Sequence, residues 1–147
     1  MKITSPDFED GGNIPGQFTC SGPGLRPKIE ISEIPPDAAE LVLFIDDPDA
    51  PSGTYNHWSL AGLIPSDEVI ISNSLPNVAY ELINSSGKSS YVPPCPPNGT
   101  HRYIFTIFAL SEKIPRSPNQ TSQEFEKIML PKISASAKLM GLYQKPS

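Results

Sequence analysis

Short apolar runs separated by turn residues extend along most of the chain. They are interrupted by 18 prolines and 10 glycines, which is the pattern of many short strands joined by turns. Residues 28–34 alternate, with Ile29 and Ile31 on one face and Lys28, Glu30 and Ser32 on the other. Such alternation predicts a half-buried antiparallel strand in an outer sheet face. The chain is therefore predicted to be mostly β.

Two runs are apolar on both faces and predict the central strands. They are residues 41–45 and 103–110, and strands that are covered on both sides have this composition. Residues 57–64 predict a further strand that a turn at 65–67 ends, and residues 138–144 predict a closing strand. The expected sheets are thus built from the middle and the end of the chain.

One helix is predicted near the C-terminus. Thr121 precedes Glu124 by three residues and forms a capping box for a helix over residues 122–130. Pro131 interrupts this helix, and a further turn or two is expected over residues 134–137.

Two segments rich in proline and glycine predict irregular structure. Residues 5–24 are expected to run over the surface, and residues 83–99 contain the run Pro93-Pro94-Cys95-Pro96-Pro97. Because a proline-rich run is stiff before folding, ordering it costs less entropy. The large apolar residues that anchor the first segment are Phe8, Ile14 and Phe18.

The composition limits the classes of protein that the chain can be. With 147 residues, 37% of them hydrophobic, it can bury one core, so residues 1–147 are predicted to be a single domain. A net charge of -5 and a pI near 4.9 disfavour nucleic acid and acidic membranes as partners. No apolar run reaches the roughly 20 residues of a membrane span. No apolar stretch follows Lys2 as in a secretory signal, so we expect a cytoplasmic protein.

The two cysteines lie far apart in the sequence. Cys20 and Cys95 have no Cys-x-x-Cys spacing that would indicate a zinc site or a redox pair. The simplest interpretation is two separate thiols. The alternative is a disulfide, which would close a long loop and add about 4 kcal/mol of stability in the chain-entropy model.

Both histidines of the chain occur in short polar motifs. Asp47 and Asp49 follow the central strand 41–45, and His57 begins the next strand after a short loop. In an antiparallel pairing His57 returns beside the strand end that carries Asp47, where a carboxylate would orient the ring and favour its charged form. His101 and Tyr103 are two residues apart in a strand and share a face. These residues predict one small polar pocket.

Each motif also has a purely structural interpretation. The Asp47-Pro48-Asp49 sequence is common in turns, and His57 could be an ordinary core residue. Arg102 is expected to point away from Tyr103 and to brace an acidic residue such as Asp49. Only the combination of motifs is specific.

The combination extends over nearly the whole chain. Its firmest parts are Asp47-Pro48-Asp49-Ala50-Pro51 with His57-Trp58, and Pro96-Pro97 with Gly99-Thr100-His101-Arg102-Tyr103; its supporting parts are Ile3-Thr4-Ser5-Pro6-Asp7-Phe8, Phe18-Thr19-Cys20 and Ala137-Lys138-Leu139-Met140-Gly141-Leu142-Tyr143. In this combination the chain resembles the phosphatidylethanolamine-binding protein family, which includes the Raf kinase inhibitor proteins and their bacterial and archaeal relatives.

The resemblance implies an antiparallel β-sandwich with Greek-key connections and a shallow anion pocket at one end of a sheet. In the family this pocket takes phosphate-like groups, including the phosphoethanolamine head group. The resemblance also implies a cis peptide bond before Pro51 and, because prokaryotic relatives tend to pair, a homodimer. By matching position, the residues implied to bind the ligand are Asp47, Asp49, Tyr55, His57, Pro97, His101 and Tyr103.

Three functional hypotheses follow. The leading one is a non-catalytic protein without a cofactor that binds small anions and has a regulatory role, because the chain has no Gly-x-Ser-x-Gly elbow and no glycine-rich phosphate loop. The second is an inhibitor of a serine protease or a kinase that acts through the stiff loop at 93–97. The third is an acid–base or metal-dependent hydrolase in which Asp47, His57 and His101 act together, with iron or zinc in the metal version.

Overall fold

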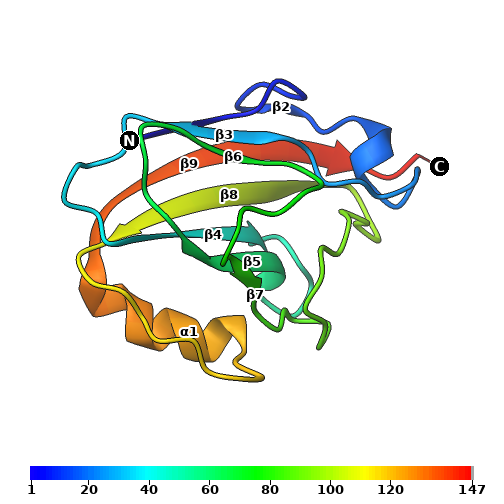
Figure 1. The fold of residues 1–147 in the computed structure, drawn as a ribbon. Helices are drawn as coiled ribbons and strands as arrows, with labels where there is room; N and C mark the ends of the chain where they lie inside the picture. Colours follow the sequence, from blue (N-terminus) through cyan, green and yellow to red (C-terminus); the bar gives the residue numbers. More distant parts are fainter. Residues whose placement is uncertain (147) are drawn as a thin grey trace.

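Nine strands and one short α-helix make up the regular structure of residues 1–146, which the computed structural model describes (Figure 1). This confirms the prediction of a mostly β protein. The strands form two sheets, and every strand pair is antiparallel except β2 with β9. The smaller sheet has the order β1 (Lys2–Thr4), β3 (Ile29–Ser32), β6 (Val69–Ile71), and the larger has the order β2 (Gly12–Asn13), β9 (Ile133–Gln144), β8 (Thr100–Leu110), β4 (Glu40–Asp47), β5 (Tyr55–Leu63), β7 (Tyr80–Glu81).

The two strands that are apolar on both faces lie in the middle of the larger sheet, as predicted. β4 pairs with β8 on one side and with β5 on the other. Residues 41, 43 and 45 point to the side where the main core cluster lies, whereas Val42 and Phe44 belong to a second cluster on the opposite face. Both faces are covered, which is why the strand carries no polar alternation.

The main core joins the two sheets. Ile29 and Ile31 of β3 are buried in one cluster with Trp58 of β5 and Phe105 of β8. The predicted anchors of the N-terminal segment, Phe8, Ile14 and Phe18, are buried in the same cluster. That segment otherwise has little regular structure, apart from β2 and a 3₁₀ turn over Gly16–Phe18. The expected Greek-key connections stay a prediction.

Helix α1 (Ser122–Met129) covers the face of the larger sheet opposite the smaller sheet (Figure 1). Its start is capped as predicted, because Thr121 Oγ1 accepts a hydrogen bond of 3.1 Å from the Glu124 N–H. Phe125 and Met129 are fully buried against Val42 of β4 and its neighbours. None of the helices in residues 1–146 is long and apolar enough to cross a membrane.

The expectation of a helical turn over residues 134–137 was wrong. These residues belong to β9, in which Ala135 and Ala137 pair with Ala109 and Ile107 of β8 and pack against the core. The intervening serines are exposed. Pairing with a long neighbouring strand therefore outweighs the helix propensity of two alanines.

The cis peptide bond before Pro51 is also not found, since all peptide bonds within residues 1–146 are trans. The trans form is intrinsically the more stable one by about 0.5–1 kcal/mol. The turn that follows Asp47 closes in this form through a hydrogen bond of 3.1 Å from the Gly53 N–H to the Ala50 carbonyl oxygen.

Candidate functional site

Three strand ends meet at one end of the larger sheet. β4 finishes at Asp47, which pairs with Tyr55 at the start of β5, and the preceding residue pairs with Ile104 near the start of β8. Because neighbouring strands run antiparallel, the last residues of β4 lie beside the first residues of β5, and the first residues of β8 extend just past the end of β4. This places the two polar motifs at one edge, as the sequence predicts.

A cavity of about 230 Å³ opens at this edge. Larger cavities of about 450 and 500 Å³ lie elsewhere, but neither contains a histidine. Residues 92–97 supply much of one wall of the 230 Å³ cavity. Six of the seven residues predicted to bind a ligand line it, namely Asp47, Tyr55, His57, Pro97, His101 and Tyr103.

Asp47 is bound to His101 and not to His57. Its Oδ2 lies 2.6 Å from His101 Nδ1, and both side chains are buried. Its Oδ1 accepts a hydrogen bond of 2.8 Å from the N–H of Asp49, so the carboxylate is held from two sides. The prediction that Asp47 would orient His57 was therefore wrong. The β4–β5 register explains this, because it puts Tyr55 opposite Asp47 and His57 two residues further along.

The ring of His57 is oriented by a backbone carbonyl. Its Nδ1 lies 2.7 Å from the Val92 carbonyl oxygen, and since a carbonyl can only accept, Nδ1 carries the hydrogen. Burial lowers the pKa of His57 below its ordinary 6.5, although the bond to Val92 and the charge of Asp47 act in the opposite direction. The ring is therefore neutral at neutral pH, and its Nε2 carries a lone pair.

Tyr103 lies between the two histidines and is fully buried. Its ring centroid is 5.3 Å from that of His57 and 6.5 Å from that of His101. Its hydroxyl has no hydrogen-bond partner in the part of the chain that the structure describes. Burial, and then the Asp47 carboxylate, raise the pKa of this hydroxyl far above its ordinary range, so it stays protonated and can donate.

Asp49 is the one predicted residue that does not line the cavity. Its carboxylate accepts hydrogen bonds from the side chain of Arg102, at 2.9 Å from Nε and 2.7 Å from Nη2, and a third of 2.9 Å from the backbone N–H of Arg102. These bonds hold the pKa of Asp49 at about 2. The expected brace between Arg102 and an acidic residue is thus confirmed, and Asp49 stabilises the turn from outside the cavity.

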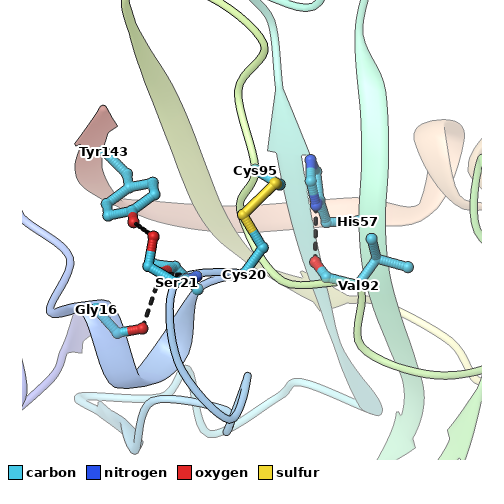
Figure 2. The surroundings of a disulfide bond; sticks show 8 residues. Gly16, Cys20, Ser21, His57, Val92, Cys95 and Tyr143 are labelled. Atoms are coloured by element: carbon cyan, nitrogen blue, oxygen red, sulfur yellow. Dashed lines mark hydrogen bonds between the residues drawn. A yellow bond between two sulfur atoms is a disulfide. The ribbon is translucent and has the colours of Figure 1, made fainter. Parts of the chain in front are cut away.

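Cys20 and Cys95 form a disulfide, so the interpretation as two separate thiols was wrong (Figure 2). The N-terminal segment runs beside the cavity wall, where the Cys20 N–H donates a hydrogen bond of 3.0 Å to the Pro94 carbonyl oxygen. The two Cα atoms are consequently 5.4 Å apart, within the usual range for a disulfide. Cys95 was expected in the stiff run 93–97 but not among the ligand-binding residues, and Val92 was not predicted as part of the site because it contributes its backbone carbonyl.

A metal-binding cluster is not present among residues 1–146, where no three His, Cys, Asp or Glu side chains are grouped to hold an ion. Asp47 and His101 already bond to each other, and Nδ1 of His57 bonds to the backbone. The geometry thus leaves two ring nitrogens, both Nε2, and the hydroxyls of Tyr55 and Tyr103 as the side-chain polar groups that a ligand could engage.

Known proteins resemble the chain over nearly its whole length. The family model described as phosphatidylethanolamine-binding protein matches residues 4–144. The UPF0098 protein of Methanothermobacter thermautotrophicus is 33% identical over 99% of both chains, and that of Chlamydia muridarum is 36% identical over 99% of both. A crystal structure from Chlamydia trachomatis, described as a homologue of the same kind of protein, superposes with a TM-score of 0.90 at 33% identity, covering 98% of this chain and 97% of the other.

Proposed function

Since the chain belongs to the phosphatidylethanolamine-binding protein family, we propose that it binds a small phosphate-like anion in the cavity between His57, His101 and Tyr103. Binding is non-catalytic and serves a regulatory role. The ligand class comprises inorganic phosphate and phosphate monoesters such as phosphoethanolamine.

The unpartnered hydroxyl of Tyr103 carries this proposal. A buried donor without a partner destabilises a fold by about 1–3 kcal/mol, and native proteins leave few such groups. An anionic oxygen in the cavity would accept a hydrogen bond from this hydroxyl. Because the charge is on the acceptor, that bond is stronger than one between neutral groups.

The free nitrogens of the two histidines support the same ligand. Each ring uses Nδ1 within the protein, which leaves Nε2 for a ligand. In its neutral form the His57 Nε2 accepts the hydrogen of a protonated phosphate oxygen, and after protonation it donates to a fully ionised one. Phosphate monoesters titrate near pH 6, so both ionisation states of the ligand are present near that pH.

Affinity for the anion is expected to be low and to depend on pH. The net charge of -5 repels anions at long range, and the cavity contains Asp47 but no lysine or arginine. Positive charge must come from protonated imidazole. Because the pKa of His57 lies below its ordinary 6.5, we expect millimolar binding that strengthens as the pH falls below 6.5.

A nuclear magnetic resonance titration with phosphate and with phosphoethanolamine tests the proposal. Both ligands should shift the ring signals of His57 and His101 in a saturable way at millimolar concentration, and sodium chloride at equal ionic strength should not. The two ligands differ by the ethanolamine group, so stronger binding of one reports which source of phosphate the cavity prefers. Ring signals that stay unchanged with both ligands would rule the proposed function out.

A further inference from the structure

The disulfide lies directly in the wall of the proposed anion site. Cys95 lines the cavity together with its neighbours Val92, Pro93, Pro96 and Pro97, and we call residues 92–97 the wall segment. Figure 2 shows the Cys20–Cys95 bond beside the ring of His57 and the Val92 carbonyl that holds this ring. The same short stretch of chain therefore contains the covalent link and a hydrogen bond that orients a ligand-facing residue.

The wall segment has few means of holding its own position. Four of its six residues are proline, and proline has no N–H to donate. The Val92 N–H donates to the His57 carbonyl oxygen over 3.1 Å. Beyond Val92, the wall segment donates no backbone hydrogen bond to the rest of residues 1–146. The disulfide therefore holds the wall segment in position, as backbone hydrogen bonds between neighbours hold the strands of the two sheets.

The other end of the disulfide is firmly anchored. Thr19, next to Cys20, is fully buried, and its hydroxyl donates to the Gly16 carbonyl oxygen over 2.8 Å. The same hydroxyl accepts a bond of 3.1 Å from the Ser21 N–H. The Ser21 hydroxyl is bonded to that of Tyr143 in β9 (Figure 2). The disulfide thus connects the wall segment to an N-terminal segment that is hydrogen-bonded to β9 of the larger sheet.

Both cysteines are exposed, unlike most of the cavity lining. A thiolate can attack a disulfide only where it can reach one of its sulfurs. Exposure at the rim of the cavity makes this disulfide accessible to a thiol reductant while the fold stays intact.

Resting on the proposed anion-binding function, we propose that the Cys20–Cys95 disulfide positions the wall segment and that its reduction weakens anion binding at His57. The reductant is a dithiol. One of its thiolates attacks a cystine sulfur to form a mixed disulfide, and its second thiol then displaces the remaining cysteine. Two electrons and two protons pass to the protein, which gains two thiols, and the dithiol becomes a disulfide.

The consequence for the ligand follows from His57. Once the link is open, the wall segment keeps only the Cys20–Pro94 hydrogen bond to the N-terminal segment, the bonds between Val92 and His57, and its packing. Movement of Val92 displaces the carbonyl oxygen that accepts the hydrogen bond from His57 Nδ1. The ring then turns, and the direction in which its Nε2 points changes. Misalignment of one hydrogen bond to an anion corresponds to a loss of roughly tenfold or more in affinity.

The reciprocal effect provides a second readout. Because an anion that prefers the oxidised form must also stabilise that form by the same factor, saturating phosphate lowers the midpoint potential of the disulfide. A tenfold preference corresponds to about 30 mV for a two-electron couple. A disulfide that merely stabilised a distant part of the fold would leave this potential unaffected by phosphate.

The experiment compares phosphate affinity in four samples: the oxidised protein, the protein reduced with dithiothreitol, and the double variant Cys20→Ser with Cys95→Ser, with and without dithiothreitol. The reduced protein and the double variant should each bind phosphate about tenfold more weakly than the oxidised protein. Dithiothreitol should not change the double variant, which controls for effects of the reagent. The midpoint potential is measured in dithiothreitol redox buffers with and without saturating phosphate.

The outcomes separate this inference from the proposed function. If the oxidised protein does not bind phosphate at millimolar concentration, the proposed function fails and this inference fails with it. If oxidised and reduced protein bind phosphate within about twofold of each other, or if phosphate leaves the potential unchanged, the inference alone is overturned. Amide exchange should become faster only in residues 16–24 and 91–98 after reduction, and global unfolding of the reduced protein would also overturn it.

Discussion

Replacement of Tyr103 by phenylalanine separates stability from ligand binding at the candidate site. The change removes one hydroxyl and keeps the aromatic ring, which packs between His57 and His101. The hydroxyl is buried and has no partner in the described part of the chain. We therefore expect Tyr103→Phe to make the ligand-free protein more stable and, at the same time, a weaker binder of phosphate.

The two magnitudes follow from the same hydroxyl. Removal of a buried polar group without a partner recovers part of a penalty of about 1–3 kcal/mol, so the free energy of unfolding should rise by about 1–2 kcal/mol. A hydrogen bond to a charged group contributes about 1.5–3 kcal/mol, so phosphate affinity should fall roughly 10- to 100-fold. Urea unfolding without phosphate measures the first quantity, and a phosphate titration at pH 6 measures the second.

Tyr80 provides a matched control. Its hydroxyl is likewise buried and without a partner among the described residues, but Tyr80 lines the separate cavity of about 450 Å³. Tyr80→Phe should raise the free energy of unfolding by a similar amount and leave phosphate affinity unchanged. Unchanged phosphate affinity in Tyr103→Phe, or an equal loss of affinity in both variants, would show that the Tyr103 hydroxyl does not bind the anion.

Three further predictions concern charge and covalent structure. Burial raises the pKa of Asp46 from 3.8 to about 6, so the charged form lowers stability by about 3 kcal/mol. Asp46→Asn should therefore stabilise the protein by up to that amount at pH 8 and by little at pH 4 in urea unfolding, and equal effects at both pH values would contradict this. Replacing Cys20 and Cys95 by serine should lower the free energy of unfolding by about 4 kcal/mol, to be checked by denaturant titration; an unchanged value would show that the link does not form. Because the pKa of His57 in the folded state lies below its ordinary 6.5, its contribution to stability is complete above pH 6.5 and is lost as the pH falls toward the folded value. His57→Gln should flatten the stability profile over that window, and an unaltered slope would speak against a neutral buried ring.

Much of the larger sheet could be predicted because its long strands have a recognisable pattern of apolar residues within a short stretch of sequence. Residues 41–45 are apolar at every position and residues 103–110 at every position except Thr106, and strands covered on both faces have this composition. The helix cap at Thr121 likewise depends on only four consecutive residues, 121–124. By contrast, β1, β6 and β7 have two or three residues each, and so short a run forms a strand only because a longer strand lies beside it. The Ser-Ala alternation at 134–137 carries too little hydrophobic contrast to distinguish strand from helix.

The candidate site shows the same division between local and long-range information. The motifs place His57 and His101 at one edge of a sheet because strand direction and alternation are enough to do so. Which histidine Asp47 contacts depends on the register of three strands, and a displacement of two residues decides it. The Cys20–Cys95 pairing depends on how two irregular segments cross, and no periodic pattern encodes such a crossing.

A crystal structure of the oxidised protein grown in phosphate near pH 6 would show whether an anion binds between the two histidines and Tyr103. We expect an anion in the 230 Å³ cavity, with one oxygen at hydrogen-bond distance from the Tyr103 hydroxyl and others near Nε2 of His57 and of His101. Typical distances for such contacts are about 2.5–3.2 Å. A cavity that contains only water at a phosphate concentration of tens of millimolar, with the Tyr103 hydroxyl bonded to that water, would contradict the claim.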